Sequence, residues 1–348
     1  MGQIKIIKPG LLTTVQDLGR YGYQQYGVTV SGVMDHVSAR LANALVENDE
    51  GEGLLEITMQ GPEIEFLEDM VIAITGGDLQ PWLNGQPIAM ARSMLVQKGD
   101  KLTFKGMKSG CRSYIAFSGG IDVPVLMGSK STFTRGKIGG YEGRALKAGD
   151  ILKVGEPKEP FSSLVDREIY ENLYEYNAVV ELRVVLGPQE EAFTEAGRRT
   201  FFSNEYTVTN ECDRMGYRLE GETIEHKDGG DIISDGISMG AIQIPSHGKP
   251  IIMMADRQTT GGYTKIGNVI TVDLPKAAQV KPGDKIVFKE ITLEEAHQLL
   301  KGLEDKITIL KQQCSRKYGK QEKEVKRTRK FHLKINGKPY NVVVEELK

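Results

Sequence analysis

The chain of 348 residues carries a formal net charge of −2, with 39% hydrophobic and 26% charged residues. Its length predicts roughly two domains, and its composition supports a hydrophobic core and excludes wholesale disorder. The balanced charge excludes a general nucleic-acid binder, which would carry a basic domain.

The cysteines, histidines and apolar runs exclude further classes of protein. Cys111, Cys212 and Cys314 lie far apart, which suits a reducing compartment and makes no zinc-binding pattern. The five histidines form no ligand pair such as His-x-x-x-His, so we expect no metal site. No apolar run reaches the roughly 18 residues of a membrane span, and the first residues do not resemble a signal peptide. We therefore expect a cytoplasmic protein with no membrane segment.

A strand is expected at residues 4–7. The stretch that follows it is the first whose composition indicates a functional site. Residues 11–36 are rich in glycine and tyrosine and too polar for a core element. Unstructured loops beyond about 12–15 residues are uncommon unless they are functional. The alternative is a long surface loop. The side chains that could face a ligand here are Gln16, Asp17, Arg20, Tyr21, Tyr23 and His36.

A helix is predicted next, over residues 34–45, because Met34, Val37, Leu41 and Leu45 recur at helical spacing. Asp35 and His36 fall in its first turn, where the helix dipole favours a carboxylate. Asp35 is therefore either a helix-start residue or a site residue, and both interpretations stay open.

Residues 54–154 read as strand after strand, with a hairpin at Asn84-Gly85. Their glycine pairs match neither the phosphate-binding loop nor the dinucleotide-binding fingerprint. We expect an N-terminal β domain over residues 1–157. The proline and charge content of residues 158–178 indicates a linker.

A second β domain is expected over residues 179–290, with strands at 179–186 and 206–210 and a short helix at 193–199. Arg214 and Arg218 lie close to Asp213 and a glycine. Arginine is a natural clamp for a carboxylate, and the alternative is a surface ion pair of little energetic value.

The richest stretch is 246–268. Its apolar run at 251–255 predicts a buried strand, and the run ends in an acid, a guanidinium, an amide, two hydroxyls and a glycine pair at residues 256–262. Charged groups beside a core cost free energy unless they are paired, and a glycine pair lets backbone N–H groups approach an anion. The stretch predicts a functional site, and the alternative is a polar hairpin whose side chains satisfy one another.

One motif in the second domain is rejected. Gly236-Ile237-Ser238-Met239-Gly240 matches the Gly-x-Ser-x-Gly pattern of serine hydrolases. That pattern needs a helix directly after the serine, whereas residues 241–245 alternate like a strand. We therefore do not expect a serine hydrolase.

The sequence pattern changes after residue 290, where the run of strands ends. Thr292 and Glu295 form a capping box, which predicts a helix followed by a basic, solvated linker, together spanning residues 291–330. Residues 331–348 read as a hairpin around Asn336-Gly337, which is too short to be stable alone.

Three stretches resemble one known family. KPGLLTTVQDLGRYGYQQYGV (8–28), SGVMDHVSARLAN (31–43) and MADRQTTGGYTKIGNVI (254–270) are similar to the biotin-dependent carboxyltransferases. That family includes the C subunit of 5-oxoprolinase, the sporulation-control protein KipA and half of the urea carboxylase carboxyltransferase domain. The resemblance covers nearly all of residues 1–290. It implies a mainly β fold with two cyclophilin-like β-barrel domains, a few short helices, and a C-terminal helix plus hairpin tail.

The resemblance also implies an activity and partners. The leading expectation is the C subunit of an ATP-dependent 5-oxoprolinase, which opens 5-oxo-L-proline to L-glutamate with the A and B subunits. The alternatives are a biotin-dependent carboxyltransferase acting on urea or another amide, and a KipA-like regulator that binds a kinase inhibitor. The expected partner is a KipI-like B subunit that shares the active site. The A subunit and a biotin carrier protein are further expected partners. The chain is expected to form a homo- or hetero-oligomer.

The cofactor expectations follow from what the sequence lacks. No nucleotide-binding loop is present, so ATP would bind elsewhere in the complex. Residues 331–348 resemble the opening hairpin of biotin carrier domains, but the biotin-accepting Ala-Met-Lys-Met motif is absent. We expect no covalent biotin on this chain and expect any carboxybiotin to come from a separate carrier.

Such chemistry needs a base within hydrogen-bond reach of the substrate and donors for a developing oxyanion. Asp256 is assigned as base or amide anchor, with Gln258 and Thr260 orienting the substrate. The other assigned substrate-binding residues are Arg214 and Arg218 for a carboxylate, the N–H groups of Gly261 and Gly262 for an oxyanion, and Tyr263, Asp35, His36 and His247.

Overall fold

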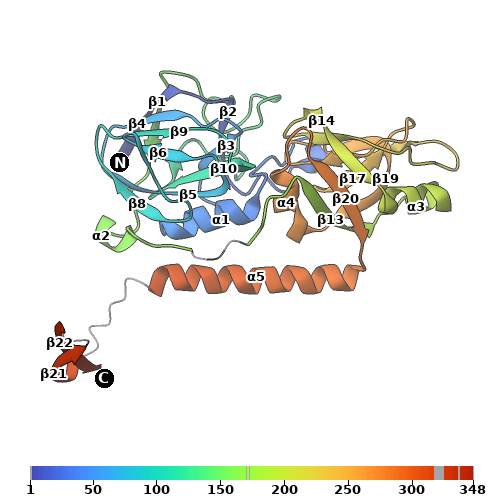
Figure 1. Cartoon of the computed structure of the whole chain (residues 1–348). Helices are drawn as coiled ribbons and strands as arrows, with labels where there is room; N and C mark the ends of the chain where they lie inside the picture. The colour runs from blue at the N-terminus through green and yellow to red at the C-terminus, as the bar shows by residue number, and fades with distance from the viewer. Residues whose placement is uncertain (1, 170, 172, 317–324, 336–337, 348) are drawn as a thin grey trace.

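The computed structural model describes residues 2–169, 171, 173–316, 325–335 and 338–347. The prediction of a mainly β chain with a few short helices and a C-terminal helix is confirmed. Two β domains lie side by side, and the long helix α5 (Leu293–Arg316) runs beneath both of them (Figure 1).

The first domain is built from two sheets. The seven-stranded sheet has the order β11 (Ile121–Asp122), β12 (Ile151–Val154), β1 (Gly2–Lys8), β4 (Glu63–Phe66), β9 (Lys101–Phe104), β6 (Pro81–Leu83) and β7 (Gln86–Pro87). The five-stranded sheet has the order β2 (Leu12–Gln16), β3 (Leu54–Thr58), β10 (Ser109–Phe117), β5 (Met70–Asp78) and β8 (Ser93–Val96). One core cluster joins the two sheets, with Ile4 and Ile6 from β1 and Leu55 and Ile57 from β3.

Helix α1 (His36–Leu45) explains why the five-stranded sheet is apolar on both faces. Val37 and Leu41 of the helix belong to one core cluster with Val71 and Ala73 of β5, whereas Ile72 belongs to the cluster between the sheets. A strand buried on both faces reads as a continuous apolar run and does not alternate.

The second domain is a closed barrel. Strand β13 (Val179–Leu186) pairs in parallel with β20 (Lys285–Glu290) and antiparallel with β19 (Thr260–Val269). The ring between them passes through β14 (Glu205–Cys212), β15 (Gly216–Glu220), β18 (Ile251–Met253) and β17 (Ala241–Ile244). Strand β16 (Asp231–Gly236) pairs with β19 outside this ring. Because every strand of the ring has two neighbours, the barrel itself leaves no open edge.

The remaining short elements lie on or between the domains. They are the helices α2 (Phe161–Leu164), α3 (Glu195–Ser203) and α4 (Leu274–Ala278), and the 3-10 turns η1 (Gln24–Tyr26), η2 (Glu190–Ala192) and η3 (Thr271–Asp273). The segment predicted as a linker, 158–178, contains α2 and is packed, with Leu164, Arg167 and Ile169 buried.

Part of the predicted ligand-facing stretch 11–36 is structural. Its start forms β2, and Gln16, Asp17 and Arg20 are buried. The Asp17 carboxylate accepts hydrogen bonds from Ser129, Lys130 and Ser131, and Arg20 donates to the carbonyls of Leu126 and Ser131. These hydrogen bonds fasten a loop of the same domain, and the assignment of Gln16, Asp17 and Arg20 to a ligand stays a prediction.

Two other boundaries differ from the prediction. The helix expected at residues 193–199 is α3, whose N-cap Thr194 accepts from the Gly197 N–H. The C-terminal hairpin starts earlier than expected: β21 (Val325–Ile335) pairs with β22 (Lys338–Leu347), so the last basic residues of the predicted linker belong to a strand. The predicted Asn336-Gly337 turn lies outside the described residues.

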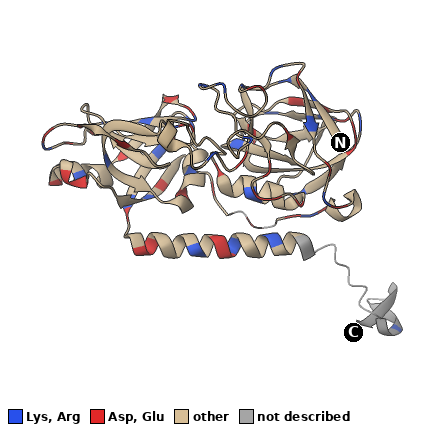
Figure 2. Ribbon diagram, turned by 180° about the vertical axis from the view of Figure 1, so that it is seen from behind, with Lys and Arg blue, Asp and Glu red and all other residues tan. Residues whose placement is uncertain are grey.

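Helix α5 ties the end of the chain to the first domain. The predicted capping box is confirmed, because the Thr292 N–H donates to Glu295 Oε2 at 2.8 Å and the Glu295 N–H donates to Thr292 Oγ1 at 3.2 Å. Arg40 of α1 donates two hydrogen bonds of 2.7 Å to the Glu304 carboxylate of α5. Figure 2 shows that charges of both signs follow one another along α5.

His36 lies at this contact between α1 and α5. Burial and the neighbouring Arg40 guanidinium lower the pKa of His36 to about 4 from its ordinary value of 6.5, against a smaller opposite effect of Glu304. Its Nδ1 atom is buried without a hydrogen-bond partner in the described part of the chain. His36 is therefore a neutral residue packed at the α1–α5 contact, and its assignment to substrate binding stays a prediction.

The two domains are joined by a buried ion triad, which we define as Glu56, Arg214 and Asp256. Arg214 Nε lies 3.0 Å from Asp256 Oδ2, Arg214 Nη2 lies 3.1 Å from Asp256 Oδ1, and Nη1 contacts Glu56 of the first domain. Arg214 Nη2 also donates to the Gly32 carbonyl at 2.6 Å. The side chains of Arg214, Asp256 and Glu56 are only 5%, 6% and 1% exposed, so solvent does not screen them.

A first prediction concerns this triad. Arg214→Met leaves two buried carboxylates without a cation and should lower the free energy of unfolding by about 3–5 kcal/mol. Arg218→Met is the matched control, because its pair with Glu211 is exposed and worth about 1 kcal/mol or less. Urea unfolding at neutral pH followed by circular dichroism measures both. Equal losses in the two variants would refute the importance of the triad.

A second prediction concerns His36. Because its folded pKa is lowered, the unfolded chain takes up the proton first, and stability is fully present above pH 6.5 and lost as the pH falls towards 4. This loss should reach about 3 kcal/mol. His36→Leu should flatten the decline, while the same change at the exposed His247 should not. An unchanged slope in His36→Leu between pH 6.5 and 4 would contradict the assignment.

Candidate functional site

The turn between β18 and β19 separates two cavities. Gln258 lines a cavity of 390 Å³ on the outer face of the barrel, which we call the small cavity. Arg257 and Thr259 line a cavity of 780 Å³ between the barrel and α5, which we call the large cavity. Neighbouring side chains of one short segment therefore enter different cavities.

The small cavity collects amide groups. Gln243 of β17 and Gln258 of the turn line it together with Tyr263 of β19. Gln243 is 2% exposed, and within the described residues neither Gln243 Nε2 nor Gln258 Oε1 has a hydrogen-bond partner. A buried donor or acceptor without a partner costs about 1–3 kcal/mol. Both atoms are shielded from solvent, so a ligand in the cavity gains these two hydrogen bonds only when the side chains of Gln243 and Gln258 rotate towards it.

Gly261 makes room for this arrangement. A Cβ atom at Gly261 would lie 2.8 Å from Gln243 Nε2 and 2.6 Å from Ile237 Cδ1. Contacts below 3.0 Å would force one of these groups to move. Gly261 therefore leaves room for the Gln243 amide at the cavity wall, and the predicted role of its N–H group towards an oxyanion stays a prediction.

The rim of the small cavity carries two arginines from different domains. Arg218 Nε lies 2.9 Å from Glu211 Oε2, and Arg135 Nη2 lies 3.0 Å from Asp213 Oδ2. All four side chains are at least half exposed, so these pairs are weak. A ligand carboxylate can replace Glu211 at Arg218, because a guanidinium binds carboxylates in a bidentate manner.

The structure brings together part of the predicted site. Gln258, Tyr263 and Arg218 meet at the small cavity. Asp256 and Arg214 lie behind it in the buried ion triad and line neither cavity. Both Asp256 oxygens accept from Arg214, and Arg214 is held by two carboxylates and a carbonyl. Both residues fix the position of the turn, and the assignments of Asp256 as base or amide anchor and of Arg214 to a substrate carboxylate stay predictions.

The other predicted residues lie elsewhere. Asp35 is fully buried as the N-cap of α1, where it accepts from the Ser38 N–H at 2.9 Å and from Gln279 Nε2 at 3.0 Å. Burial raises the pKa of Asp35. The helix-start interpretation is therefore right. Thr260, Gly262 and His247 line neither cavity, and the roles assigned to Thr260 and Gly262 stay predictions.

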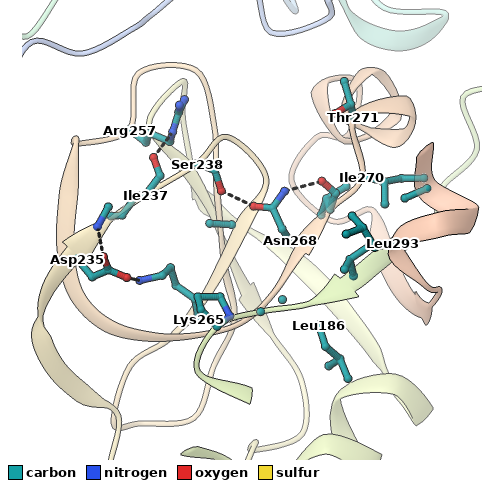
Figure 3. Close-up of a pocket in the computed structure, with 18 of the residues that line it drawn as sticks. Leu186, Asp235, Ile237, Ser238, Arg257, Lys265, Asn268, Ile270, Thr271 and Leu293 are labelled. Atoms are coloured by element: carbon teal, nitrogen blue, oxygen red, sulfur yellow. Dashed lines mark hydrogen bonds and ion pairs between the residues drawn. The ribbon is translucent and has the colours of Figure 1, made fainter. Parts of the chain in front are cut away.

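The large cavity contains residues to which the sequence analysis gave no role. Figure 3 shows Asp235, Lys265 and Arg257 on one side of it and Leu186, Ile270 and Leu293 on the other. Lys265 and Asn268 come from β19, which follows the turn. Arg257 and Asn268 belong to the stretch 246–268, which the sequence predicted to be a functional site. The cavity that their side chains enter depends on the strand pairing and could not be read from the sequence.

Ser238 of the Gly-x-Ser-x-Gly pattern also lines the large cavity. Its hydroxyl donates to Asn268 Oδ1 at 2.5 Å. Strand β16 precedes it and strand β17 follows it, so the helix that a nucleophile elbow needs is absent at this point of the described chain. The predicted strand after Ser238 is confirmed.

Among the described residues, no group of three or more histidine, cysteine, aspartate or glutamate side chains is placed to hold a metal ion. No helix within these residues has the length and apolar character needed to span a bilayer.

Comparison with known proteins gives a consistent family. The carboxyltransferase domain, subdomains A and B, matches residues 26–290. The C subunit of the 5-oxoprolinase of Escherichia coli (strain K12) is 38% identical over 293 residues, which cover 84% of this chain and 93% of that protein. The urea amidolyase of Saccharomyces cerevisiae is 38% identical over 312 residues, which cover 85% of this chain but 17% of that protein.

A solved structure agrees with the sequence comparisons. The crystal structure of the K. lactis urea amidolyase superposes with a TM-score of 0.81 at 34% identity, over 88% of this chain and 20% of that chain. The match thus corresponds to a part of a much longer protein. The chain belongs to the family of carboxyltransferase domains built from subdomains A and B.

Proposed function

We propose that this chain is the C subunit of an ATP-dependent 5-oxoprolinase and opens 5-oxo-L-proline to L-glutamate together with the A and B subunits. The proposal is supported by the extent of the match: two 5-oxoprolinase C subunits align over 93% and 90% of their own lengths. The urea enzymes align over a small fraction of theirs.

The observation that carries the site assignment is the pair of unpartnered amide groups in the small cavity. 5-Oxoproline is a five-membered lactam, so its N–H and its C=O lie on one edge. Gln258 Oε1 accepts from the lactam N–H, and Gln243 Nε2 donates to the lactam oxygen. Both buried groups then gain the partner that they lack among the described residues.

Arg218 supplies the second anchor. It exchanges Glu211 for the carboxylate of 5-oxoproline, and the two anchors together fix the orientation of the ring. A donor at the lactam oxygen also stabilises the negative charge that develops there when the carbonyl carbon is attacked. The contribution of this chain is therefore to bind, orient and polarise the lactam.

The remaining components belong to the partners in this proposal. We assign ATP binding to the other subunits, because the sequence has no glycine-rich phosphate-binding loop. Any carboxybiotin is supplied by a separate carrier. The complex with a KipI-like B subunit and the A subunit operates in the cytoplasm.

A second candidate is a carboxyltransferase acting on urea, which the urea amidolyase relatives favour. Urea presents the same N–H and C=O edge to Gln258 and Gln243 but has no carboxylate for Arg218. Arg218 therefore separates the two candidates. A third candidate, a KipA-like regulator, would bind its partner without any turnover.

A third prediction tests the site in the assembled complex. The chain is purified with the A and B subunits, and ATP hydrolysis and glutamate release are measured with 5-oxoproline. Gln243→Leu and Gln258→Leu should each lower kcat/KM about tenfold, since each removes one hydrogen bond to the lactam. Arg218→Gln should raise KM for 5-oxoproline. Gln298→Leu on the exposed side of α5 is the matched control and should change neither constant.

The same assay contains the opposing outcomes. Turnover with urea, bicarbonate and a biotin carrier, insensitive to Arg218→Gln, would replace the leading function with the urea carboxyltransferase. Tight binding to the B subunit without turnover of either substrate would leave the regulator. Full 5-oxoproline activity in both glutamine variants would overturn the site assignment while leaving the function in place.

A further inference from the structure

The large cavity has an apolar wall that comes from two elements. Leu186 and Ile270 of the second domain and Leu293 and Leu300 of α5 line it. Figure 3 shows Leu186, Ile270 and Leu293 around the same end of the cavity. Its volume of 780 Å³ falls in the range that holds a drug-sized ligand, about 300–1,000 Å³. This cavity is much larger than a five-membered lactam requires.

The α5 part of this wall is an apolar helix face that the protein covers only in part. Leu293, Ala296, His297 and Leu300 line the cavity at the spacing of one helix face. The same face continues through Leu303, Ile307 and Leu310, which are buried in the cluster around α1. Leu293, in contrast, is 52% exposed. The face is covered where α1 lies against it and open where it meets the large cavity.

The opposite side of the cavity carries one positive charge that is not neutralised. Lys265 is 4% exposed and pairs with Asp235 at 2.9 Å, so these two charges cancel. Arg257 donates to the carbonyls of Ile237 at 3.0 Å and Met254 at 3.2 Å. Within the described residues, no carboxylate lies within 4.0 Å of its guanidinium nitrogens. Arginine stays protonated in proteins, so the charged lining residues sum to one net positive charge.

We propose that the large cavity is a second ligand-binding site, which takes a carboxylate carried on an apolar body. The carboxylate pairs with Arg257, and the apolar body lies against Leu186, Leu293 and Leu300. One unbalanced cation matches a single negative charge, which favours a carboxylate over a dianionic phosphate. Nothing in the proposed reaction at the small cavity uses these residues, so this site goes beyond the proposed function.

The position of α5 in the chain supports a separate role for this site. The family match ends at residue 290, before α5 begins. Leu293, Ala296 and Leu300 of the apolar wall therefore come from a helix that begins after the residues matched by the family model. Helix α5 therefore contributes to the shape of the large cavity together with the barrel.

The test measures binding of simple carboxylates to the full chain by calorimetry and by ligand-observed NMR. Affinity should rise about fourfold per methylene from acetate to hexanoate, as the chain covers the apolar wall. Hexanamide and hexyl phosphate should bind at least about tenfold more weakly than hexanoate, because neither is a monocarboxylate. 3-Phenylpropanoate distinguishes an aromatic body from an aliphatic one of similar length.

Two variants separate binding from folding. Arg257→Gln should remove the preference for hexanoate over hexanamide. Because Arg257 also donates to two backbone carbonyls, His297→Trp provides a second route: it fills the cavity from the surface of α5 and leaves those hydrogen bonds intact. It should weaken hexanoate at least about tenfold with an unchanged Tm. Gln298→Trp, on the exposed side of α5, is the matched control and should bind hexanoate like the unmodified chain.

Three results would overturn the second site. They are the absence of any binding by hexanoate and 3-phenylpropanoate, equal affinity for hexanoate and hexanamide, and hexanoate binding that both Arg257→Gln and His297→Trp leave unchanged. Hexanoate that is displaced by 5-oxoproline and lost in Gln258→Leu would assign it to the small cavity, which also overturns the proposal. If the complex does not turn over 5-oxoproline, all of these outcomes can still be interpreted, because the binding experiment needs no partner protein.

Discussion

The position of Arg214 between Glu56 and Asp256 is the interaction on which the rest of the structure depends. Burying charges is costly unless their remaining hydrogen-bonding groups are satisfied. Here the Glu56 carboxylate also accepts from the Met34 N–H at 2.8 Å and the Tyr114 hydroxyl at 3.0 Å. The Glu56 carboxylate of the first domain thus fixes the position of the Arg214 guanidinium. Arg214 in turn fixes Asp256, which lies at the start of the turn whose residues line both cavities.

Much of the fold is readable in the sequence because its signals are local. Alternating strands, the Asn-Gly hairpin and the Thr292–Glu295 capping box each depend on residues within a few positions. The composition of the stretch 246–268 also predicted the turn whose residues line the two cavities. The pairing of Arg214 with Asp256 and Glu56 was not predicted, because the partners are 42 and 158 residues away. The sequence shows that such charges need partners but not which partners the barrel brings near.

The sequence also does not show the direction in which each side chain points. Arg214 and Arg218 look alike in the sequence, yet one is buried in the triad and the other stands at the rim of the small cavity. Arg257, which received no role from the sequence, is the guanidinium that keeps an unbalanced charge. An arginine's function depends on whether the fold supplies its counter-charge, and that is a property of tertiary packing.

Arg257 and Gln258 are consecutive residues that face different cavities, and this has a consequence for anyone who redesigns the protein. Because one backbone segment sets the aim of both side chains, substitutions at the two positions should not combine additively. A variant selected for a new carboxylate in the large cavity would carry an altered lactam preference with it. Tuning either cavity independently requires changes on elements that only one of them touches, such as α5 for the large cavity or β14 and β15 for the small one.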